Sequence, residues 1–288
     1  MASTVYFTQA ITPQTVVRVY EALGHPATGK VGIKISTGEP GPRGGNWLDP
    51  QLIRELVELV AGTLVETNMA YPGRRTTTEE HLQVAAEHGY TAIAPVDILD
   101  ADGSIELPVR PGGHLSRDIV GSHLRNYDHL IVLSHFKGHA MSGFGGAIKN
   151  LAVGLASPVG KVNIYSAGRS TSHWSGTDQN DFLESVAEAA VAVTDFVGHH
   201  ILYLNIVNNL SVDCDCNGDA APATMADIGV LGSLDPVALD QATIDLVWQA
   251  PDSDDLKERI ESRNGRYVLE QTEQMGLGSR QYDLVRLD

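Results

Sequence analysis

The chain has 288 residues, with 36 acidic against 20 basic side chains, and its formal net charge at pH 7 is −16. Such a charge repels nucleic acid, and no basic cluster larger than the pair Arg74 and Arg75 offsets it. No apolar run is long enough to cross a bilayer, and the first residues lack the basic and apolar segments of a secretory signal. We therefore expect a cytoplasmic protein that handles small molecules, with neither nucleic acid nor membrane as a partner.

Two cysteines are present, Cys214 and Cys216, in the segment VDCDCNGD. Alternate residues of an extended chain point to opposite sides, so a disulfide between these two would be strained. We expect that no disulfide holds this fold together, which agrees with a cytoplasmic location.

Apolar segments typical of strands alternate along the chain with segments of helical periodicity. The predicted strands cover residues 4–10, 30–36, 63–68, 91–98, 128–135, 200–212 and 282–288. The predicted helices cover residues 12–23, 49–61, 76–89, 145–156, 181–198, 235–250 and 270–278. This alternation predicts an α/β fold with a mostly parallel sheet flanked by helices on both faces. We expect one unit over residues 1–288, with a division into lobes of about 1–125 and 126–288 as the alternative.

Polar or glycine-rich loops lie at the carboxyl ends of four predicted strands. Their sequences are STGEPG, ETNMAYPGRR, SHFKGHAMSGFGG and DCDCNGDA. In open parallel sheets, ligands bind beyond the carboxyl ends of the strands. We therefore predict that the four loops converge on one crevice.

Two glycine motifs resemble nucleotide-binding loops but lack essential features. GHPATGKV has Val31 where a P-loop needs Ser or Thr, and the helix and strand around it are in reverse order. GFGG is followed by Ile148 where a dinucleotide fingerprint needs its third glycine. A glycine turn that enters a helix can still present backbone N–H groups to a phosphate or carboxylate.

The segment SHFKGHAMSGFGGAIKN combines proton-exchanging and anion-binding groups at a strand end. His139 and His135 are the acid–base candidates, because imidazole exchanges protons near neutral pH. Lys149 could hold an anion at the helix start or act as a nucleophile when desolvated, and a solvated helix lysine is the alternative. Further anion-binding candidates in this segment are Ser142, Gly143, Gly145, Gly146 and Asn150.

Two earlier segments add candidates. Lys34 interrupts the apolar strand VGIKIS, and a buried lysine must face a cleft or a partner because burying its charge is costly. His81 and His88 lie seven residues apart on one predicted helix, and we expect that helix face to be solvated. Donors for a carboxylate or phosphate are offered by Asn68, Tyr71 and Arg75.

The segment DCDCNGD resembles the first half of a calcium loop, but Thr224 occupies the position that requires Glu. A less regular site for a divalent metal is one interpretation, and a turn rich in Asp and Asn with two incidental thiols is the other. The candidate ligands combine hard and soft donors, and they are Asp213, Cys214, Asp215 and Cys216, with His173 in addition.

Five segments carry a resemblance to a known family: KVGIKISTGEPG, ETNMAYPGRRTTTEEH, LIVLSHFKGHAMSGFGGAIKNLAVGLAS, DCDCNGDAAPATMADIGVLGSLDPVALDQATIDLV and GLGSRQYDLV. They are similar, nearly end to end, to the uncharacterised Fe–S centre proteins, domain-of-unknown-function family 362. Many members carry a ferredoxin-like insert with cysteines for two 4Fe–4S clusters after the SHFKGH motif. This chain has no cysteine there, so we expect no 4Fe–4S cluster from it alone. The resemblance implies a separate ferredoxin-like protein as a candidate partner.

HAMSGFGGAIK is similar to a segment of the nickel-pincer lactate racemase family. In that family a histidine and a lysine lie ten residues apart around a glycine-rich turn. The histidine is an acid–base residue, and the lysine tethers the cofactor. His139 and Lys149 keep this spacing, whereas Tyr165 stands where that family has its nickel-binding histidine.

Together these features predict an enzyme that binds a small anion at the strand ends and moves a proton or hydride next to a carboxylate, as isomerases and racemases do. A metal-binding or redox protein that uses the DCDC loop is the first alternative. A non-catalytic partner of a separate Fe–S protein is the second. The substrate, the metal and the oligomeric state do not follow from the sequence.

Overall fold

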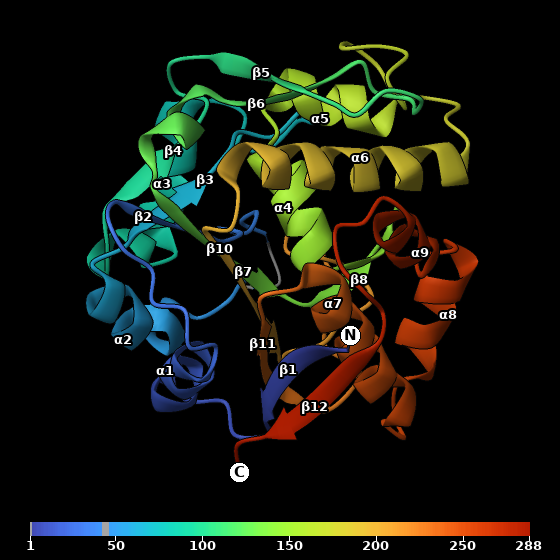
Figure 1. Cartoon of the computed structure of the whole chain (residues 1–288). Coiled ribbons are helices and arrows are strands. Elements are labelled where there is room, and N and C mark those ends of the chain that lie inside the picture. Colours follow the sequence, from blue (N-terminus) through green and yellow to red (C-terminus); the bar gives the residue numbers. More distant parts are fainter. Residues whose placement is uncertain (1, 42–45) are drawn as a thin grey trace.

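The computed structural model describes residues 2–41 and 46–288, and an eight-stranded sheet runs through its middle (Figure 1). The strand order is β12-β1-β11-β10-β7-β2-β3-β4. Strand β11 is antiparallel to both of its neighbours, and the other neighbouring strands are parallel. The predicted α/β fold with a mostly parallel sheet is therefore confirmed.

The sheet is formed by β1 (Ser3–Thr8), β2 (Val31–Lys34), β3 (Thr63–Glu66), β4 (Val96–Ile98), β7 (His129–His135), β10 (Ile201–Val207), β11 (Gly229–Ser233) and β12 (Tyr282–Arg286). Two short antiparallel ribbons are separate from it: β5 (Ser104–Pro108) with β6 (Arg117–Gly121), and β8 (Lys137–His139) with β9 (Gly143–Gly145). The helices are α1 (Pro13–Ala22), α2 (Pro50–Val60), α3 (Thr78–Glu87), α4 (Ala147–Leu155), α5 (Pro158–Tyr165), α6 (Gln179–Val197), α7 (Pro236–Gln249), α8 (Asp254–Ser262) and α9 (Tyr267–Gln274), with short 3-10 helices η1 (Tyr90–Ala92) and η2 (Ser122–Asn126).

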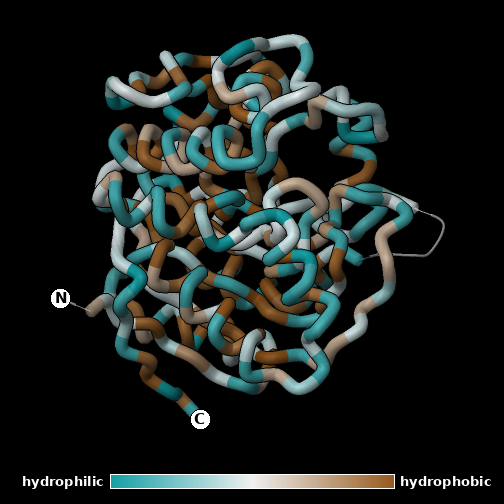
Figure 2. Tube along the Cα trace, turned by 90° about the vertical axis from the view of Figure 1, so that its right-hand side faces the viewer, coloured by the Kyte–Doolittle hydropathy of each residue, from teal (hydrophilic) through white to brown (hydrophobic). Residues whose placement is uncertain are grey.

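Each face of the sheet has its own apolar core, and the alternating side chains of β7 contribute to both. Leu130 and Val132 pack with residues of α4, α6, α7 and α9, whereas Ile131 and Leu133 pack with residues of α1 and α2. Figure 2 shows the hydrophobic segments concentrated inside the fold. A strand that is buried on both faces has a continuous apolar sequence, which explains the pattern HLIVLSH. No helix in the described part of the chain is long and apolar enough to span a membrane.

The structure contains elements that periodicity alone did not predict. Strand β11 is short and contains two glycines, and α8 is mostly charged, with only Leu256 and Ile260 buried. The predicted strand 91–98 begins as η1 and forms only β4, after Pro95, which has no N–H for a sheet ladder. The predicted strand 200–212 ends at Val207 because the chain then turns into the loop with the cysteines.

A buried carboxylate from α7 caps the amino end of α4. The backbone N–H groups of Ala147 and Ile148 donate to Asp240 at 2.8 and 2.9 Å, and Asn205 Nδ2 donates to the same carboxylate at 2.8 Å. Burial raises the pKa of Asp240 to about 6, although these donors act in the opposite direction. Because α4 carries Lys149, this cap fixes the helix that presents that lysine.

We expect Asp240→Ala to lower the free energy of unfolding by about 2–4 kcal/mol, because three buried donors lose their acceptor. Urea unfolding followed by circular dichroism would measure the change. Asp283→Ala, at an exposed position of β12, is the matched control and should change stability by less than about 0.5 kcal/mol. Equal effects of the two substitutions would contradict the role of the cap.

Candidate functional site

A pocket with about 670 Å³ of empty space, part of it open to solvent, lies at the carboxyl ends of the central strands. Lys34, Glu66 and His135 are the last residues of β2, β3 and β7, and all three line it. The loop after β10 contributes residues 214–216. The predicted convergence of the loops is therefore confirmed.

Lys34 and Glu66 form a buried ion pair in the wall of the pocket. Lys34 Nζ lies 2.8 Å from Glu66 Oε1, 2.9 Å from Asn150 Oδ1 and 2.5 Å from the Ile35 carbonyl. Burial lowers the pKa of Lys34, and Glu66 acts against that shift. All three N–H bonds of the ammonium have acceptors, so Lys34 holds β2, β3 and α4 together and has no donor left for a ligand.

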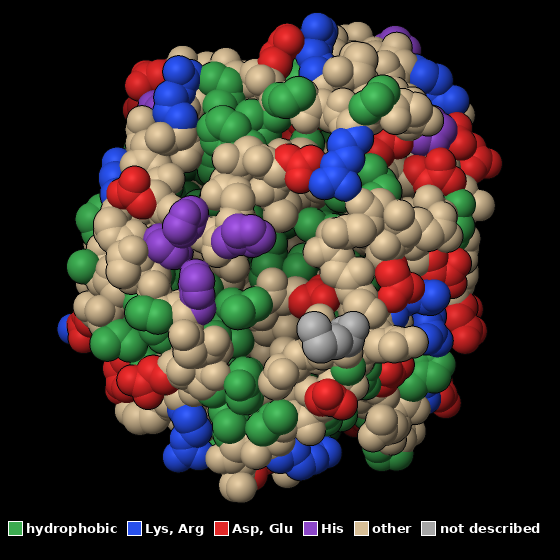
Figure 3. Space-filling model, in the orientation of Figure 1, with side chains coloured by type: hydrophobic (Ala, Val, Ile, Leu, Met, Phe, Trp, Pro, Cys, Tyr) green, Lys and Arg blue, Asp and Glu red, His purple; other side chains and the backbone are tan. Residues whose placement is uncertain are grey.

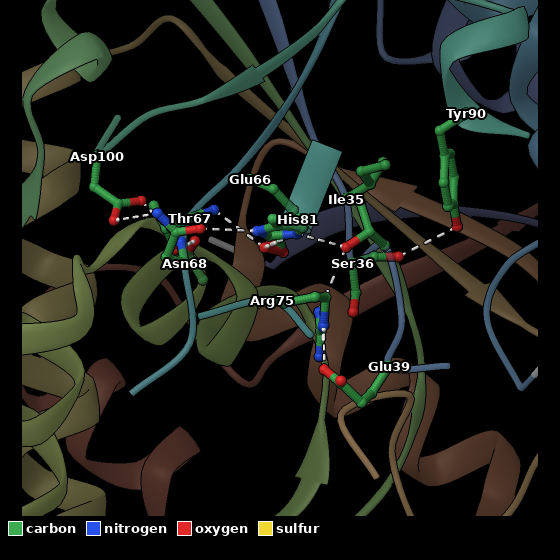
Figure 4. A network of polar contacts seen from close by, with 12 residues as sticks. Ile35, Ser36, Glu39, Glu66, Thr67, Asn68, Arg75, His81, Tyr90 and Asp100 are labelled. Carbon is green, nitrogen blue, oxygen red and sulfur yellow. Dashed lines mark hydrogen bonds and ion pairs between the residues drawn. The ribbon is translucent and has the colours of Figure 1, made fainter. Parts of the chain in front are cut away.

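Two hydrogen-bond donors in the pocket wall have no partner among the described residues. Arg75 is fully buried, with Nε 3.0 Å from Glu39 Oε2 (Figure 4), while its Nη2 is buried and unpaired among the described residues. The buried hydroxyl of Tyr71 is also unpaired in that part of the chain. A buried donor without an acceptor is destabilising, which indicates a place for an acceptor from a ligand.

Lys149 lines the same pocket from α4. Its ammonium makes no hydrogen bond or ion pair with the residues that the structure describes. Burial, with the charge of Lys34 as the next cause, lowers the pKa of Lys149 to about 8. At pH 7 the side chain is therefore a cation at the pocket wall without a carboxylate partner.

A second lysine without a carboxylate partner, Lys161 of α5, was not among the sequence candidates. It is 2% exposed, and its Nζ lies 2.5 Å from Thr67 Oγ1 and 2.6 Å from the Ala156 carbonyl. Burial lowers its pKa to about 7, so much of it is a neutral amine at neutral pH. A detectable signal was present: after Ser157, a helix cap followed by proline, the lysine interrupts the mostly apolar sequence PVGKVNIY.

His139 of β8 lines the pocket as a neutral ring. The backbone N–H groups of Met141 and Ser142 donate to its Nδ1 at 3.1 and 3.0 Å. Nδ1 must therefore carry the lone pair, which puts the proton of the neutral imidazole on Nε2. Burial, with the charges of Lys149 and Arg259, holds the pKa of His139 well below its ordinary value. The ring is a neutral N–H donor at pH 7.

Asp215 connects the loop after β10 to β7 and β8. Its Oδ1 lies 2.8 Å from Lys137 Nζ, and its Oδ2 lies 3.5 Å from His135 Nδ1. Burial by itself would raise the pKa of Asp215, but Lys137 and His135 outweigh it and hold this pKa well below the ordinary range. The other ring nitrogen of His135, Nε2, lies 2.9 Å from the Asn208 carbonyl, whereas Nδ1 and Asp215 Oδ2 make no hydrogen bond among the described residues.

The two cysteines are joined by a disulfide. The sequence-based prediction assumed an extended chain at this point, whereas residues 212–216 form a bend and a turn. The bond spans only three residues and does not link distant parts of the fold. Both sulfurs lie at the pocket, and with His139 they form a group whose candidate metal-ligating atoms lie within 4.8 Å of one another.

Two of the predicted glycine positions line the pocket, but the helix start behind them is occupied. Gly145 and Gly146 are at the pocket wall. The first N–H groups of α4 donate to Asp240 instead of facing an empty anion site. Asn150 also lines the pocket and accepts from Lys34. The glycine turn therefore shapes the wall, and the helix amino terminus is not free to hold an anion.

Other sequence candidates lie away from the pocket wall. Asp213 pairs with Arg259 at 3.0 Å, and His173 is exposed on a loop. Ser142 donates its hydroxyl to a backbone carbonyl within its own turn, which it helps to fix. Gly143 has a φ of 82°, a conformation that favours glycine.

Asn68, His81 and His88 do not line the pocket, and Figure 4 shows Asn68 and His81 in the polar network that also contains Glu66 and Arg75. Asn68 donates to Asp100 at 3.0 Å and lies 3.3 Å from His81 Nδ1. The expectation of a solvated helix face is wrong, because His81 is fully buried and His88 stacks on Trp47 with ring centroids 3.4 Å apart. Burial lowers the pKa of His81 to about 3, so the ring is neutral.

The family model of the Domain of unknown function (DUF362) matches residues 31–245. The chain belongs to the DUF362 family. Every residue that lines the pocket lies within the DUF362 match. No curated protein sequence matches the chain significantly.

Two solved structures are similar to this DUF362 protein. One is the lactate racemase apoprotein from Thermoanaerobacterium thermosaccharolyticum, with 14% identity, a TM-score of 0.48, and coverage of 84% of this chain and 56% of that one. The other is a protein from Thermotoga maritima, with 11% identity, a TM-score of 0.47, and coverage of 91% of this chain and 58% of that one. This chain thus spans a little more than half the length of each.

We expect the free energy of unfolding of wild type to rise with pH between 7 and 10, with Lys161 contributing about 1.4 kcal/mol per pH unit. The folded-state pKa of Lys161 is about 7, below its ordinary 10.5, so in this window the unfolded chain binds a proton that the folded chain does not. Lys161→Met should remove this part of the slope in urea unfolding at several pH values. Lys30→Met, at an exposed position, is the control. An unchanged slope in Lys161→Met would contradict the shifted pKa.

Proposed function

We propose that this protein is an enzyme that binds a small carboxylate or phosphate in the pocket and transfers a proton at the carbon next to a carboxylate, as isomerases and racemases do. The proposal rests on three hydrogen-bond donors that line one pocket. None of the three has a hydrogen-bond or ion-pair partner among the described residues, and they are Lys149 Nζ, Arg75 Nη2 and Tyr71 Oη. A bound anion would give all three an acceptor, and charge-assisted hydrogen bonds of this kind are strong.

The balance of charge in the pocket favours an anionic ligand. Glu66 is already paired with Lys34, and Asp215 with Lys137. Neither carboxylate has a separate counter-charge to offer Lys149. A carboxylate or phosphate would supply that counter-charge within the pocket, whereas a neutral ligand would leave it uncompensated.

The proposed roles follow from protonation state. A catalytic base works best when its pKa is near the working pH, which favours Lys161 with a pKa of about 7. Its neutral amine would take the proton from the substrate carbon, and the resulting ammonium would return it, so the step needs no oxidant or reductant. Lys149 would hold the carboxylate. The Nε2–H of His139 would donate to the substrate oxygen on which negative charge develops.

Hydrogen exchange in D2O tests the proton transfer. We expect wild type to exchange the α-hydrogen of at least one compound in a panel of 2-hydroxy and 2-amino carboxylates, observed by proton NMR. Lys161→Met should slow this exchange by at least about 100-fold. Lys257→Met, on α8 outside the pocket, is the matched control. Exchange that survives in Lys161→Met at the wild-type rate would contradict the assigned base.

Anion binding is measured separately, so that it does not depend on finding the substrate. Oxalate, malonate and inorganic phosphate are the probes, and isothermal titration calorimetry is the measurement. We expect at least one of them to bind wild type, and Lys149→Met to weaken that binding by about 10-fold or more. Absence of binding by all three probes, together with no α-hydrogen exchange, would overturn the proposed function.

A metal-binding function of the DCDC loop is the second candidate. The grouping of Cys214, Cys216 and His139 favours it, because two thiolates and one imidazole can hold zinc with an open fourth position. The two backbone N–H groups that face His139 Nδ1 count against it, because they keep the proton on Nε2. Tyr165 also lines the pocket, so a phenol stands where the lactate racemase family has an imidazole.

Elemental analysis decides this second candidate. If the site is real, protein purified without oxygen and with the thiols reduced should contain one equivalent of metal more than Cys214→Ser purified in the same way. Metal-free reduced protein that binds the anion probes normally would exclude the metal site and leave the first proposal intact.

A further inference from the structure

We propose that His25, His129 and His200 form a second binding site, for a divalent transition-metal ion, which goes beyond the proposed function of the pocket. His129 is the first residue of β7, and His200 immediately precedes β10. Because β7 and β10 are parallel, both histidines lie at the amino-terminal edge of the sheet, opposite to the pocket. His25 comes from the loop after α1. Three segments that are distant in sequence therefore bring one imidazole each to this edge.

The spacing of the ring nitrogens fits a metal ion. One candidate ligand atom from each ring lies within 4.8 Å of the other two, and His200 Nδ1 is 3.3 Å from His129 Nε2. Zinc–imidazole bonds of about 2.0–2.1 Å in a tetrahedron place two ligand nitrogens about 3.3–3.4 Å apart. His129 and His200 already have this separation. His25 is partly exposed on a loop, so its ring can approach them without disturbing the core.

One tautomer of His129 presents a free nitrogen to a metal. Its Nδ1 lies 2.9 Å from the Thr28 carbonyl oxygen, and the Thr28 backbone N–H also points to this nitrogen at 3.2 Å. When the proton is on Nδ1, this nitrogen donates to the carbonyl and Nε2 keeps the lone pair that faces His200, which is the form that a metal at Nε2 requires. Metal-binding histidines usually donate their second ring N–H to a carbonyl or carboxylate, which fixes the ring. His129 is 5% exposed, so packing fixes it further.

The donor set selects the class of metal. Three neutral imidazoles without a thiolate suit zinc, copper, nickel or cobalt, whereas magnesium and calcium prefer oxygen ligands. His25 also lines a hollow to which His199 and Asp195 contribute. Histidine side chains are visible together on this face of the molecule (Figure 3).

Zinc titration by isothermal calorimetry tests the site. The Cys214→Ser/Cys216→Ser protein is the starting form, so that the pocket thiols cannot bind the probe. We expect one Zn²⁺ per chain, and His25→Ala and His200→Ala should each weaken binding by at least about 10-fold. His129 is buried, and its substitution could disturb folding, so the test rests on the two more accessible histidines. His173→Ala, at an exposed histidine elsewhere, is the control and should bind as the starting form does.

Copper provides an independent measurement. The electron paramagnetic resonance spectrum of one added equivalent of Cu²⁺ should show coupling to several imidazole nitrogens, and His200→Ala should reduce that coupling. Zinc binding that is equally strong in His25→Ala, His200→Ala and His173→Ala would overturn the proposal. Absence of stoichiometric zinc binding to the starting form would overturn it as well. Neither result would affect the proposed function of the pocket.

Discussion

The buried contact of Lys34 with Glu66 is the constraint on which the arrangement of the pocket depends. An ammonium and a carboxylate can be removed from water together only when each has its hydrogen-bond partners. Here Asn150 and a backbone carbonyl complete the acceptors of Lys34, and the carboxylate also accepts from the Thr67 backbone N–H at 3.1 Å. The pair thereby fixes the ends of two strands and one helix at the point where the chain leaves the sheet.

The same ion pair explains why two other lysines at the pocket have no carboxylate partner among the described residues. Glu66 is committed to Lys34, and Asp215 is committed to Lys137. Lys149 and Lys161 then share a partly dehydrated space without a carboxylate of their own among the described residues, and burial moves the pKa of each toward neutrality. A lysine whose pKa is lowered by burial is well suited to bind an anion or to exchange a proton with a ligand.

His139 shows how the local backbone decides the role of a side chain. From the sequence, an imidazole in a glycine-rich turn could equally be a base, an acid or a metal ligand. The turn directs two backbone N–H groups at Nδ1, which leaves a proton on Nε2. In the enzyme that we propose, the base is therefore a lysine, and the imidazole is a hydrogen-bond donor. The turn that was expected to bind an anion instead orients this ring, and Asp240 occupies the helix start behind it.

The sequence by itself determined the α/β class, the mostly parallel sheet and the four loops that meet at its carboxyl edge, because these follow from local periodicity and from the direction that parallel strands share. It also singled out His139, Lys149 and the cysteine loop, because such residues are unusual beside apolar strands.

Only the tertiary structure decided which charges are compensated, because Lys34 and Glu66 are distant in sequence and their pairing depends on strand order. The burial of Lys161 was also evident only from the structure. His25, His129 and His200 lie together because the loop after α1 reaches the starts of the parallel strands β7 and β10. A local pattern can mark a lysine in an apolar segment, as at Lys34 and Lys161, but it cannot show which charges are compensated, because long-range pairing is a property of the packed molecule.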